Sequence, residues 1–345
     1  MKKMFLLLSL MFLMIGCGKD KSETTGTKEV KKTLTFYAGL QEDHAAMIAK
    51  KFEEETGIKT SFVRMSSGEV LARLKAEKNN MSASVWYGGP VDAFVAANEA
   101  GLIESYISPE AVNINEEQKD PDGNWTGIYV GYLGFVGNQK MLDEKRLEMP
   151  TSWADLLKPE YKGEIVVAHP GSSGTAYTML ATLVQLMGED EAMEYLKKFN
   201  GQVRQYTKSG TAPGRMAGQG ETTIGITFLH DAIKYKKEGY IDIVISAPSE
   251  GTGYEIGGVA LLKNGPDQET AKQFIDWVLT KEVQEMGKTV GSFQFLTNKD
   301  AMPPAEADPI KDTKLIKYDF DWAGKNRVRL VERFSIETST IAPKK

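Results

Sequence analysis

Short strand-like runs alternate with amphipathic, helix-like segments from Thr33 onward. Residues 33–38, TLTFYA, alternate apolar and polar side chains as a half-buried strand does. Residues 44–57, HAAMIAKKFEEETG, place Ile48 and Phe52 on one helical face and end in Gly57, a common helix stop. The same pairing recurs in 58–64 with 68–80 and in 84–89 with 91–101. Such alternation predicts a parallel sheet covered by helices.

A second run of the same kind begins after residue 138. The segment 175–188, TAYTMLATLVQLMG, gathers Met179, Leu183 and Met187 on one face and predicts a helix. Other predicted helices are 152–163, 212–220 and 231–239, and the predicted strands are 164–168, 201–207, 222–228 and 240–246. The chain therefore contains two α/β units in succession.

Two glycine-rich stretches, 130–138 and 247–262, bound the second unit. If both are crossings, one lobe consists of 33–130 plus 250–345 and the other of 138–246. The predicted hinges then lie near 130–138 and 246–258. Two lobes joined in this way enclose a cleft.

The N-terminus has the features of an export signal. Lys2 and Lys3 precede an apolar run, Met4 to Ile15, that is too short for a stop-transfer helix, and Gly16-Cys17 follow. The ending LMIGC resembles a bacterial lipobox, in which the cysteine becomes the lipid-carrying first residue. We therefore predict a lipoprotein signal peptide at 1–16, lipidation at Cys17 and a flexible, polar tether at 17–32. A plain signal peptide is the alternative.

Composition narrows the range of functions. Cys17 is the only cysteine, so the mature chain can form neither an internal disulfide nor a cysteine-ligated metal site. The formal net charge of −5 disfavours nucleic acid as a partner. Neither a GxSxG nor an HExxH motif occurs, so an enzyme is only a distant alternative.

Several segments, taken in order, resemble one family. They are the lipobox, ETGIKTSFVRMSSGEVLARLKAEKNN, PTSWADLLKPEYKGEIVVAHPGSSGTAYTML, GQGETTIGITF and EGTGYEIGGVALLKNGPDQETAKQFIDWVLTKEVQE. Together they are similar to the solute-binding proteins of bacterial ABC importers, in the branch of ferric-iron-binding and hexose-phosphate-binding proteins.

The resemblance implies an α/β, two-lobe periplasmic-binding-protein (type 2) fold with a hinged interlobe cleft. It also implies a monomer without cofactor or catalytic activity that is anchored outside the cytoplasm and captures a small anionic ligand. The ligand would pass to an ABC permease. Because the chain has no GxxxxGK[ST] motif, the ATPase must be a separate subunit.

Serine-rich helix starts are the candidate anion sites. Backbone N–H groups are free there, and the helix dipole favours negative charge. Ordinary helix capping is the alternative for each. With the family resemblance, the candidate ligand-binding residues are Ser66, Ser67, Gly68, Ser172, Ser173, Gly174 and Thr175, followed by Ser209, Gly210 and Thr211.

The residues of the loop after the strand 222–228 distinguish the two branches of the family. The ferric branch places a tyrosine pair there, but this chain has Leu229-His230, and the next tyrosine is Tyr235. Near the position of that branch's other ligand, a histidine after the first strand, the chain has Gln41 or Glu42, and His44 comes later, at the start of a predicted helix. Binding of ferric iron or of an iron chelate remains the alternative function.

The hexose-phosphate branch has a His-Asp pair in this loop and a glutamate on the second crossing. By position these correspond to His230, Asp231 and Glu255, which would bond sugar hydroxyls. A helix cap by Asp231 is the alternative. Tyr87 and His169 are further candidates, whereas Arg64, Arg204 and Arg215 are assigned to solvated surface.

Overall fold

The computed structural model describes residues 32–343 of the 345-residue chain. The predicted signal peptide, Cys17 and the tether as far as Lys31 lie outside the described residues. Of the helices within 32–343, none combines the length and the apolarity that crossing a bilayer requires.

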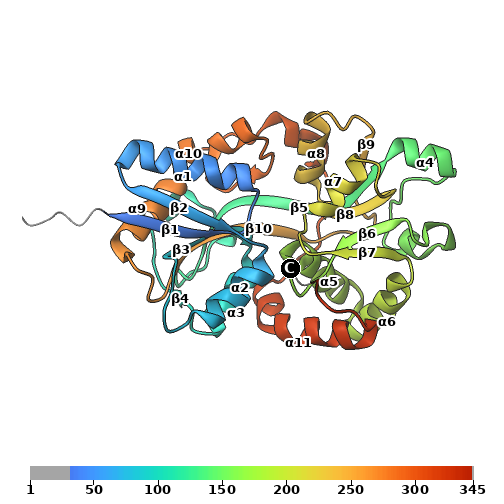
Figure 1. Cartoon of the computed structure of the whole chain (residues 1–345), viewed down its shortest axis with the longest axis horizontal. Helices are drawn as coiled ribbons and strands as arrows, with labels where there is room; N and C mark the ends of the chain where they lie inside the picture. The colour runs from blue at the N-terminus through green and yellow to red at the C-terminus, as the bar shows by residue number, and fades with distance from the viewer. Residues whose placement is uncertain (1–31, 344–345) are drawn as a thin grey trace, which may run out of the picture. The chain divides into compact units, whose positions relative to one another are not determined.

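The strands join through hydrogen bonds in the order β2-β1-β3-β10-β5-β8-β6-β7, with β4, β9 and β11 at the side (Figure 1). They are β1 Thr33–Ala38, β2 Lys59–Arg64, β3 Val85–Pro90, β4 Ile103–Glu104, β5 Thr126–Asn138, β6 Ile165–Ala168, β7 Val203–Thr207, β8 Ile224–Phe228, β9 Ile243–Ser246, β10 Tyr254–Leu262 and β11 Phe295–Leu296. We call the part with β1–β4, β10 and β11 the first lobe and the part with β6–β9 the second lobe.

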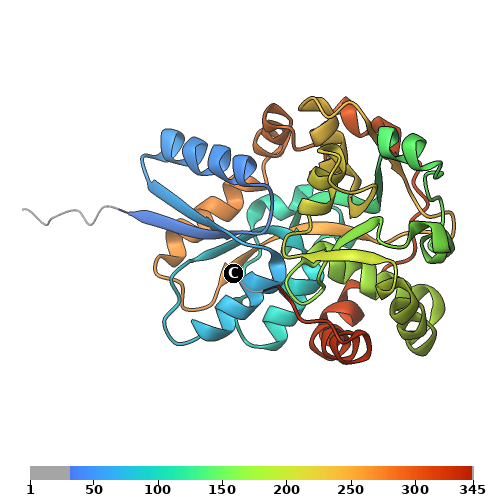
Figure 2. The same ribbon diagram turned by 45° about the vertical axis from the view of Figure 1, so that its right-hand side comes forward.

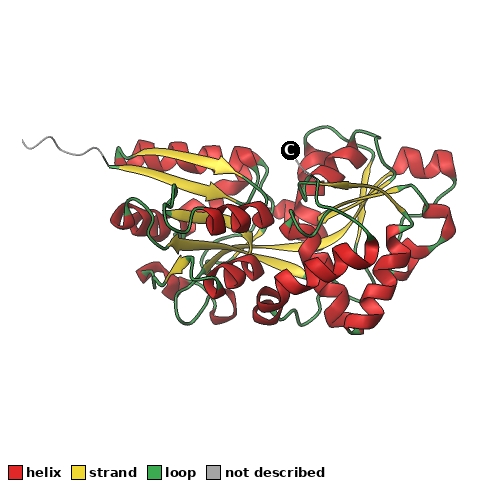
Figure 3. Ribbon diagram, turned by 60° about the horizontal axis from the view of Figure 1, so that its bottom comes forward, coloured by secondary structure: helices red, strands yellow, loops and turns green. Residues whose placement is uncertain are grey.

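Helices flank the strands of both lobes (Figure 3). They are α1 Glu42–Thr56, α2 Ser67–Ala76, α3 Val91–Glu99, α4 Gln139–Lys145, α5 Gly174–Met187, α6 Glu189–Asn200, α7 Ala212–Gly218, α8 Leu229–Lys237, α9 Gln268–Val278, α10 Lys281–Met286 and α11 Phe320–Thr338. Short 3₁₀ helices are η1 Pro109–Asn113, η2 Glu116–Gln118, η3 Ala154–Leu157, η4 Pro159–Tyr161, η5 Gly287–Val290 and η6 Ala305–Ile310.

Strand β5 runs through both lobes. Its residues 126–132 pair with β10, and residues 133–137 pair with β8. The chain leaves the first lobe along β5 and returns along β10, so these two strands are antiparallel. The parallel pairing predicted for the alternating strands is confirmed within each lobe, and the antiparallel pairs arise because the crossing strands β5 and β10 are themselves part of the sheet. Within each lobe the remaining principal pairs, β1 with β2 and β3 and β6 with β7 and β8, are parallel.

Local signals set the helix ends. Gly57, with a φ of 72°, ends α1, and its N–H donates to the Glu53 carbonyl. At the start of α5, the Ser173 side chain accepts from the Ala176 N–H. The predicted helix 152–163 is instead the two 3₁₀ turns η3 and η4. Pro159, which lacks an N–H and disfavours a helical residue before it, separates them.

The C-terminal helix α11 contacts both lobes. Ala323, Leu330 and Phe334 belong to the hydrophobic core that α5 and β6 form in the second lobe, and other residues of α11 pack on α3 of the first lobe (Figure 2). The sequence assigns the whole of 250–345 to the first lobe, because the alternation of elements does not reveal which core a late helix joins. The predicted lobe boundaries stay a prediction.

Candidate functional site

A cavity lies between the lobes, where α2, α5 and α8 begin. About 420 Å³ of space there is free of protein atoms, and this volume includes space that is open to solvent. The cavity is lined by Gly39, Leu40, Gln41, Arg64, Ser66, Ser67, Pro90, Tyr129, Ser173, Gly174, Thr175, Gly210, Thr211, Phe228, His230, Asp231, Glu255 and Gln294.

Most of the predicted site residues meet in this cavity, although they come from distant parts of the chain. Those that line it are Gln41, Ser66, Ser67, Ser173, Gly174, Thr175, Gly210, Thr211, His230, Asp231 and Glu255. Those that do not line it are Gly68, Tyr87, His169, Ser172 and Ser209.

Gly68 and Ser172 join the lobes behind the cavity wall. The Gly68 N–H donates to the Ser172 carbonyl at 3.1 Å. The Ser172 hydroxyl donates to the carbonyls of Lys208 at 2.9 Å and His169 at 3.2 Å. Nearby, the Lys208 ammonium contacts the Glu69 carboxylate across the cleft. These residues hold the lobes together and are not free to receive a ligand.

The other three predicted residues, Tyr87, His169 and Ser209, contact other protein groups. The Tyr87 hydroxyl lies 3.4 Å from Nε2 of His44, inside the first lobe. The His169 ring packs edge-on against Tyr206 and Phe334, and its Nδ1 accepts from the Gly171 N–H. The Ser209 hydroxyl lies 2.9 Å from that of Thr211, which does line the cavity.

Arg64 lines the cavity, so its assignment to solvated surface is wrong. It is the last residue of β2, and its Nε donates to the Leu40 carbonyl at 3.1 Å. Both terminal guanidinium nitrogens lie 3.5 Å from the Ser209 hydroxyl of the second lobe. Its place at the carboxyl end of a strand is the signal that reveals it, because open α/β sheets bind ligands at that edge.

The starts of α2 and α5 bring hydroxyl and backbone donors to the cavity. Ser66 precedes α2 and forms a capping box with Glu69, in which the Ser66 N–H donates to the Glu69 carboxylate at 3.2 Å. The Ser66 side chain is buried and lines the cavity. Ser173 and Gly174 open α5 on the other side. Two helix N-termini and the Arg64 guanidinium make this part of the cavity suited to an anion.

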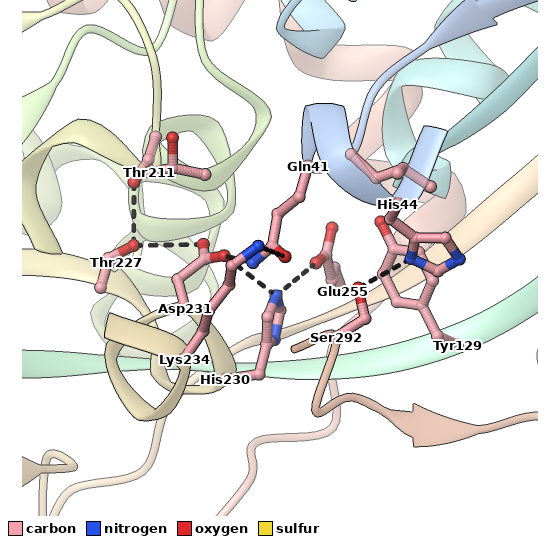
Figure 4. Close-up of polar contacts among 12 residues, drawn as sticks. Gln41, His44, Tyr129, Thr211, Thr227, His230, Asp231, Lys234, Glu255 and Ser292 are labelled. Atoms are coloured by element: carbon pink, nitrogen blue, oxygen red, sulfur yellow. Dashed lines mark hydrogen bonds and ion pairs between the residues drawn. The ribbon is translucent and has the colours of Figure 1, made fainter. Parts of the chain in front are cut away.

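His230 (Figure 4) lies in the first turn of α8. Its ring is stacked on that of Phe228, with the ring centroids 5.6 Å apart. Its Nε2 is 3.7 Å from Asp231 Oδ1 and 4.0 Å from Glu255 Oε1. Nδ1 is buried and has no hydrogen-bond partner among the described residues. Burial lowers the pKa of His230, against the opposing effect of Asp231, so the imidazole is neutral at physiological pH.

Asp231 does not cap α8. The helix begins at Leu229 with Phe228 in the cap position, so Asp231 lies within the first turn. Its Oδ1 accepts from Nε2 of Gln41, which belongs to the other lobe, and the Thr227 hydroxyl lies 3.5 Å from its Oδ2 (Figure 4). The carboxylate is thus held in the cavity wall by a contact between the lobes.

Lys234 lies one turn further along α8 and fixes the Gln41 amide. Its ammonium donates to Gln41 Oε1 at 3.1 Å, to the Val290 carbonyl at 3.2 Å and to the Asp43 carboxylate. All three acceptors are in the first lobe, and Lys234 is 7% exposed. Because Oε1 receives the ammonium, the amide N–H₂ of Gln41 is directed to Asp231.

Glu255 lies on β10 and is 3% exposed. Burial raises its pKa well above the usual range, and the carboxylates of Asp231 and Asp92 raise it further. Its side chain packs beside Gly131 of β5. A Cβ atom at Gly131 would lie 2.5 Å from Cε1 of His230 and 3.0 Å from Glu255 Oε1, so only glycine leaves room for both groups.

A family model described as "bacterial extracellular solute-binding protein" matches residues 90–326, more than half of the chain. The chain belongs to this family. The predicted family and the predicted two-lobe α/β fold are therefore confirmed, and the molecule is a solute-binding protein of an ABC importer. A small ligand and a permease are the partners that membership implies.

Three relatives illustrate the range of the family. This solute-binding protein is 43% identical to the periplasmic binding protein AfuA from Actinobacillus pleuropneumoniae, solved with exogenous fructose-6-phosphate bound; the match covers 90% of this chain and 100% of that one, with a TM-score of 0.87. It is also 43% identical to an uncharacterized protein of Haemophilus influenzae, over 90% of this chain and 92% of the other. The Fe(3+)-binding periplasmic protein of Serratia marcescens is 24% identical, over 83% and 85% of the two chains.

The position of the ferric branch's tyrosine pair is occupied by the start of α8. Leu229 is buried in a small hydrophobic core, and His230 faces the cavity. Tyr235 is buried, and its hydroxyl donates to the Thr211 carbonyl at 3.2 Å. Across residues 32–343, no group of three or more His, Cys, Asp and Glu side chains has an arrangement that could hold a metal ion.

Proposed function

We propose that this solute-binding protein captures a phosphorylated sugar, with a hexose phosphate as the representative ligand. The observation that carries the proposal is the division of polar groups within one cavity. Arg64 and the helix starts at Ser66 and Ser173 supply donors for a phosphate. His230, Asp231 and Glu255 supply groups for hydroxyls.

The relative with bound fructose-6-phosphate supports the same ligand class, since it is 43% identical over nearly the whole chain. Leu229-His230 in place of a tyrosine pair weighs against ferric iron, because hard Fe³⁺ sites require anionic oxygen ligands. Iron or an iron chelate stays the alternative, and the titration below separates the two.

Calorimetric titration of the mature protein tests the proposal. We expect fructose 6-phosphate to bind at least about 100-fold more tightly than fructose or inorganic phosphate, because each fragment lacks half of the charged or hydroxyl contacts. Ferric citrate is the competing ligand. Tight iron binding with a tyrosinate absorption band, and no heat with any phosphate, would sink the proposal.

Replacing His230 or Asp231 with alanine is expected to weaken hexose-phosphate binding by about 1 to 3 kcal/mol each, since each change strands buried polar partners. The same titration measures it, with Lys236→Ala as the control, because Lys236 is an exposed residue of the same helix. Unchanged affinity in both variants would leave the pair with a structural role only.

We also propose where the protein is located and in which oligomeric state it works. The mature protein begins at Cys17, carries lipid there and works as a monomer on the outer face of the cytoplasmic membrane or at the cell surface. It has no catalytic activity and uses no cofactor. Intact-mass measurement of the membrane fraction tests the anchor: a diacylglyceryl-sized mass increase that is lost in Cys17→Ser is the expected result.

A further inference from the structure

We propose that Glu255 enters the complex as a neutral carboxylic acid and donates its O–H to an oxygen of the ligand, so that it selects for an acceptor at that point. The inference rests on the proposed function and deepens it. It assigns different roles to the two acids of the cavity: Asp231 accepts hydrogen bonds, and Glu255 carries a proton and donates one.

The hydrogen bonds of the two acids differ. Asp231 receives the amide N–H₂ of Gln41 and has the Thr227 hydroxyl at 3.5 Å. The Glu255 carboxyl is just as buried, yet no hydrogen bond reaches it from any residue in 32–343. Nε2 of His230 lies 4.0 Å from Glu255 Oε1 (Figure 4). A buried carboxylate without donors is far less stable than a buried carboxylic acid.

The charges around Glu255 favour the same assignment. From α8 it faces His230, which is neutral because of burial, and Asp231. From α3 the carboxylate of Asp92 acts on it, but that group is already paired with Arg327 of α11. From β5 the Tyr129 hydroxyl accepts from the Gly89 N–H. The cation named among these groups, Arg327, is paired with Asp92, so these neighbours leave no cation to stabilise an ionised Glu255.

A proton on the Glu255 carboxyl group favours the binding of an anionic ligand. Asp231 Oδ1 and Glu255 Oε1 lie 3.7 and 4.0 Å from the same atom, Nε2 of His230. Two carboxyl groups that approach one atom in this way disfavour each other's ionisation. A phosphate monoester adds up to two negative charges to the closed cavity at neutral pH. A neutral Glu255 removes one repulsion and provides a donor that an ionised carboxylate lacks.

The change Glu255→Gln tests this assignment, because the glutamine amide is neutral, similar in shape and able to donate. With fructose 6-phosphate at about pH 7, we expect Glu255→Ala to lose about tenfold in affinity and Glu255→Gln to lose clearly less, because the amide still donates a hydrogen bond where the carboxylic acid does. A raised pKa means that the donor is present at low pH and is lost as the pH rises through that pKa. The wild type is therefore expected to lose affinity as the pH rises through the raised pKa of Glu255, whereas Glu255→Gln is not, since the phosphate is already mostly ionised above neutral pH.

Asp231→Asn is the matched comparison. Because Asp231 accepts hydrogen bonds and the amide nitrogen of an asparagine cannot, this variant is expected to lose about tenfold in affinity already at neutral pH. A loss of tenfold or more in Glu255→Gln at neutral pH, with the wild type binding normally, would show that an ionised Glu255 is needed and would overturn the inference alone.

Infrared difference spectra of the ligand-free proteins provide a second readout. We expect the wild type minus Glu255→Gln spectrum to contain the carbonyl stretch of a protonated carboxyl group at neutral pH. Its absence would overturn the inference even if the variant binds poorly for other reasons. A wild type that binds no hexose phosphate would instead contradict the proposed function, and the infrared result would still decide the state of Glu255.

Discussion

Replacing Arg327 with methionine is expected to lower the free energy of unfolding by about 3 to 5 kcal/mol, because it leaves a buried carboxylate without its partner. The Arg327 guanidinium is 2.6 Å from Asp92 Oδ1, and both side chains are almost wholly buried between α3 and α11. The Tyr318 hydroxyl donates to the same carboxylate at 3.3 Å, and the guanidinium lies over the Tyr177 ring. Chemical denaturation at neutral pH measures the effect.

The pH dependence identifies the cause. Burial raises the pKa of Asp92 to about 6, and Arg327 opposes that rise. Without Arg327 the pKa rises further, so ionising Asp92 costs more in the folded state. The deficit of the variant is therefore largest at neutral pH and shrinks towards about pH 5, where Asp92 takes up a proton.

Arg329→Met is the control for this prediction. Arg329 is on the same helix and pairs with Glu189, but its side chain is 53% exposed. Removing such a surface pair is expected to cost less than about 1 kcal/mol. Equal losses in the two variants, or a loss in Arg327→Met that does not vary with pH, would contradict this account of the buried pair.

Lys234→Met is expected to weaken ligand binding by about 1.5 to 2 kcal/mol, although Lys234 does not line the cavity. Its ammonium reaches three acceptors of the first lobe from a helix of the second, so it stabilises the arrangement in which the lobes are closed. The loss is expected in the dissociation rate, with the association rate nearly unchanged, because the contacts form after the ligand has entered. Stopped-flow measurements separate the two rates.

Lys236→Met controls for charge on the same helix, since Lys236 is exposed. A slower association rate in Lys234→Met with unchanged dissociation would mean that the lysine steers the ligand and does not hold the lobes. An effect of equal size in both variants would mean that the overall charge of α8 is what matters.

Much of the fold follows from local patterns. The strands β1 to β3 and β6 to β9 carry apolar or alternating runs, and Gly57 ends α1 where the sequence predicts. The partners of α11 are not predictable in this way. Its residues pack on α3 on one side and on the second-lobe core on the other. The sequence of a helix with two buried faces does not show which lobe each face packs against.

The site residues, too, are predictable from local sequence only in part, because some of them reach the cavity through contacts between distant segments. Helix starts point to Ser66 and Ser173, but the sequence does not distinguish Ser173, which caps α5, from Ser172, which bonds the neighbouring loop. Gln294 lines the cavity from a segment without any recognisable motif. Such residues reach the site only through the packing of the two lobes, which depends on contacts far apart in the chain.

The place of β10 in the sheet has a consequence for chain synthesis. β10 lies between β3 and β5, yet it is made after all the strands of the second lobe. The strands β5, β6, β7 and β8 are available once residue 228 has emerged, whereas β3 keeps an unpaired edge until residue 262 is present. A chain truncated before that point exposes a buried, apolar strand edge, which is an aggregation hazard.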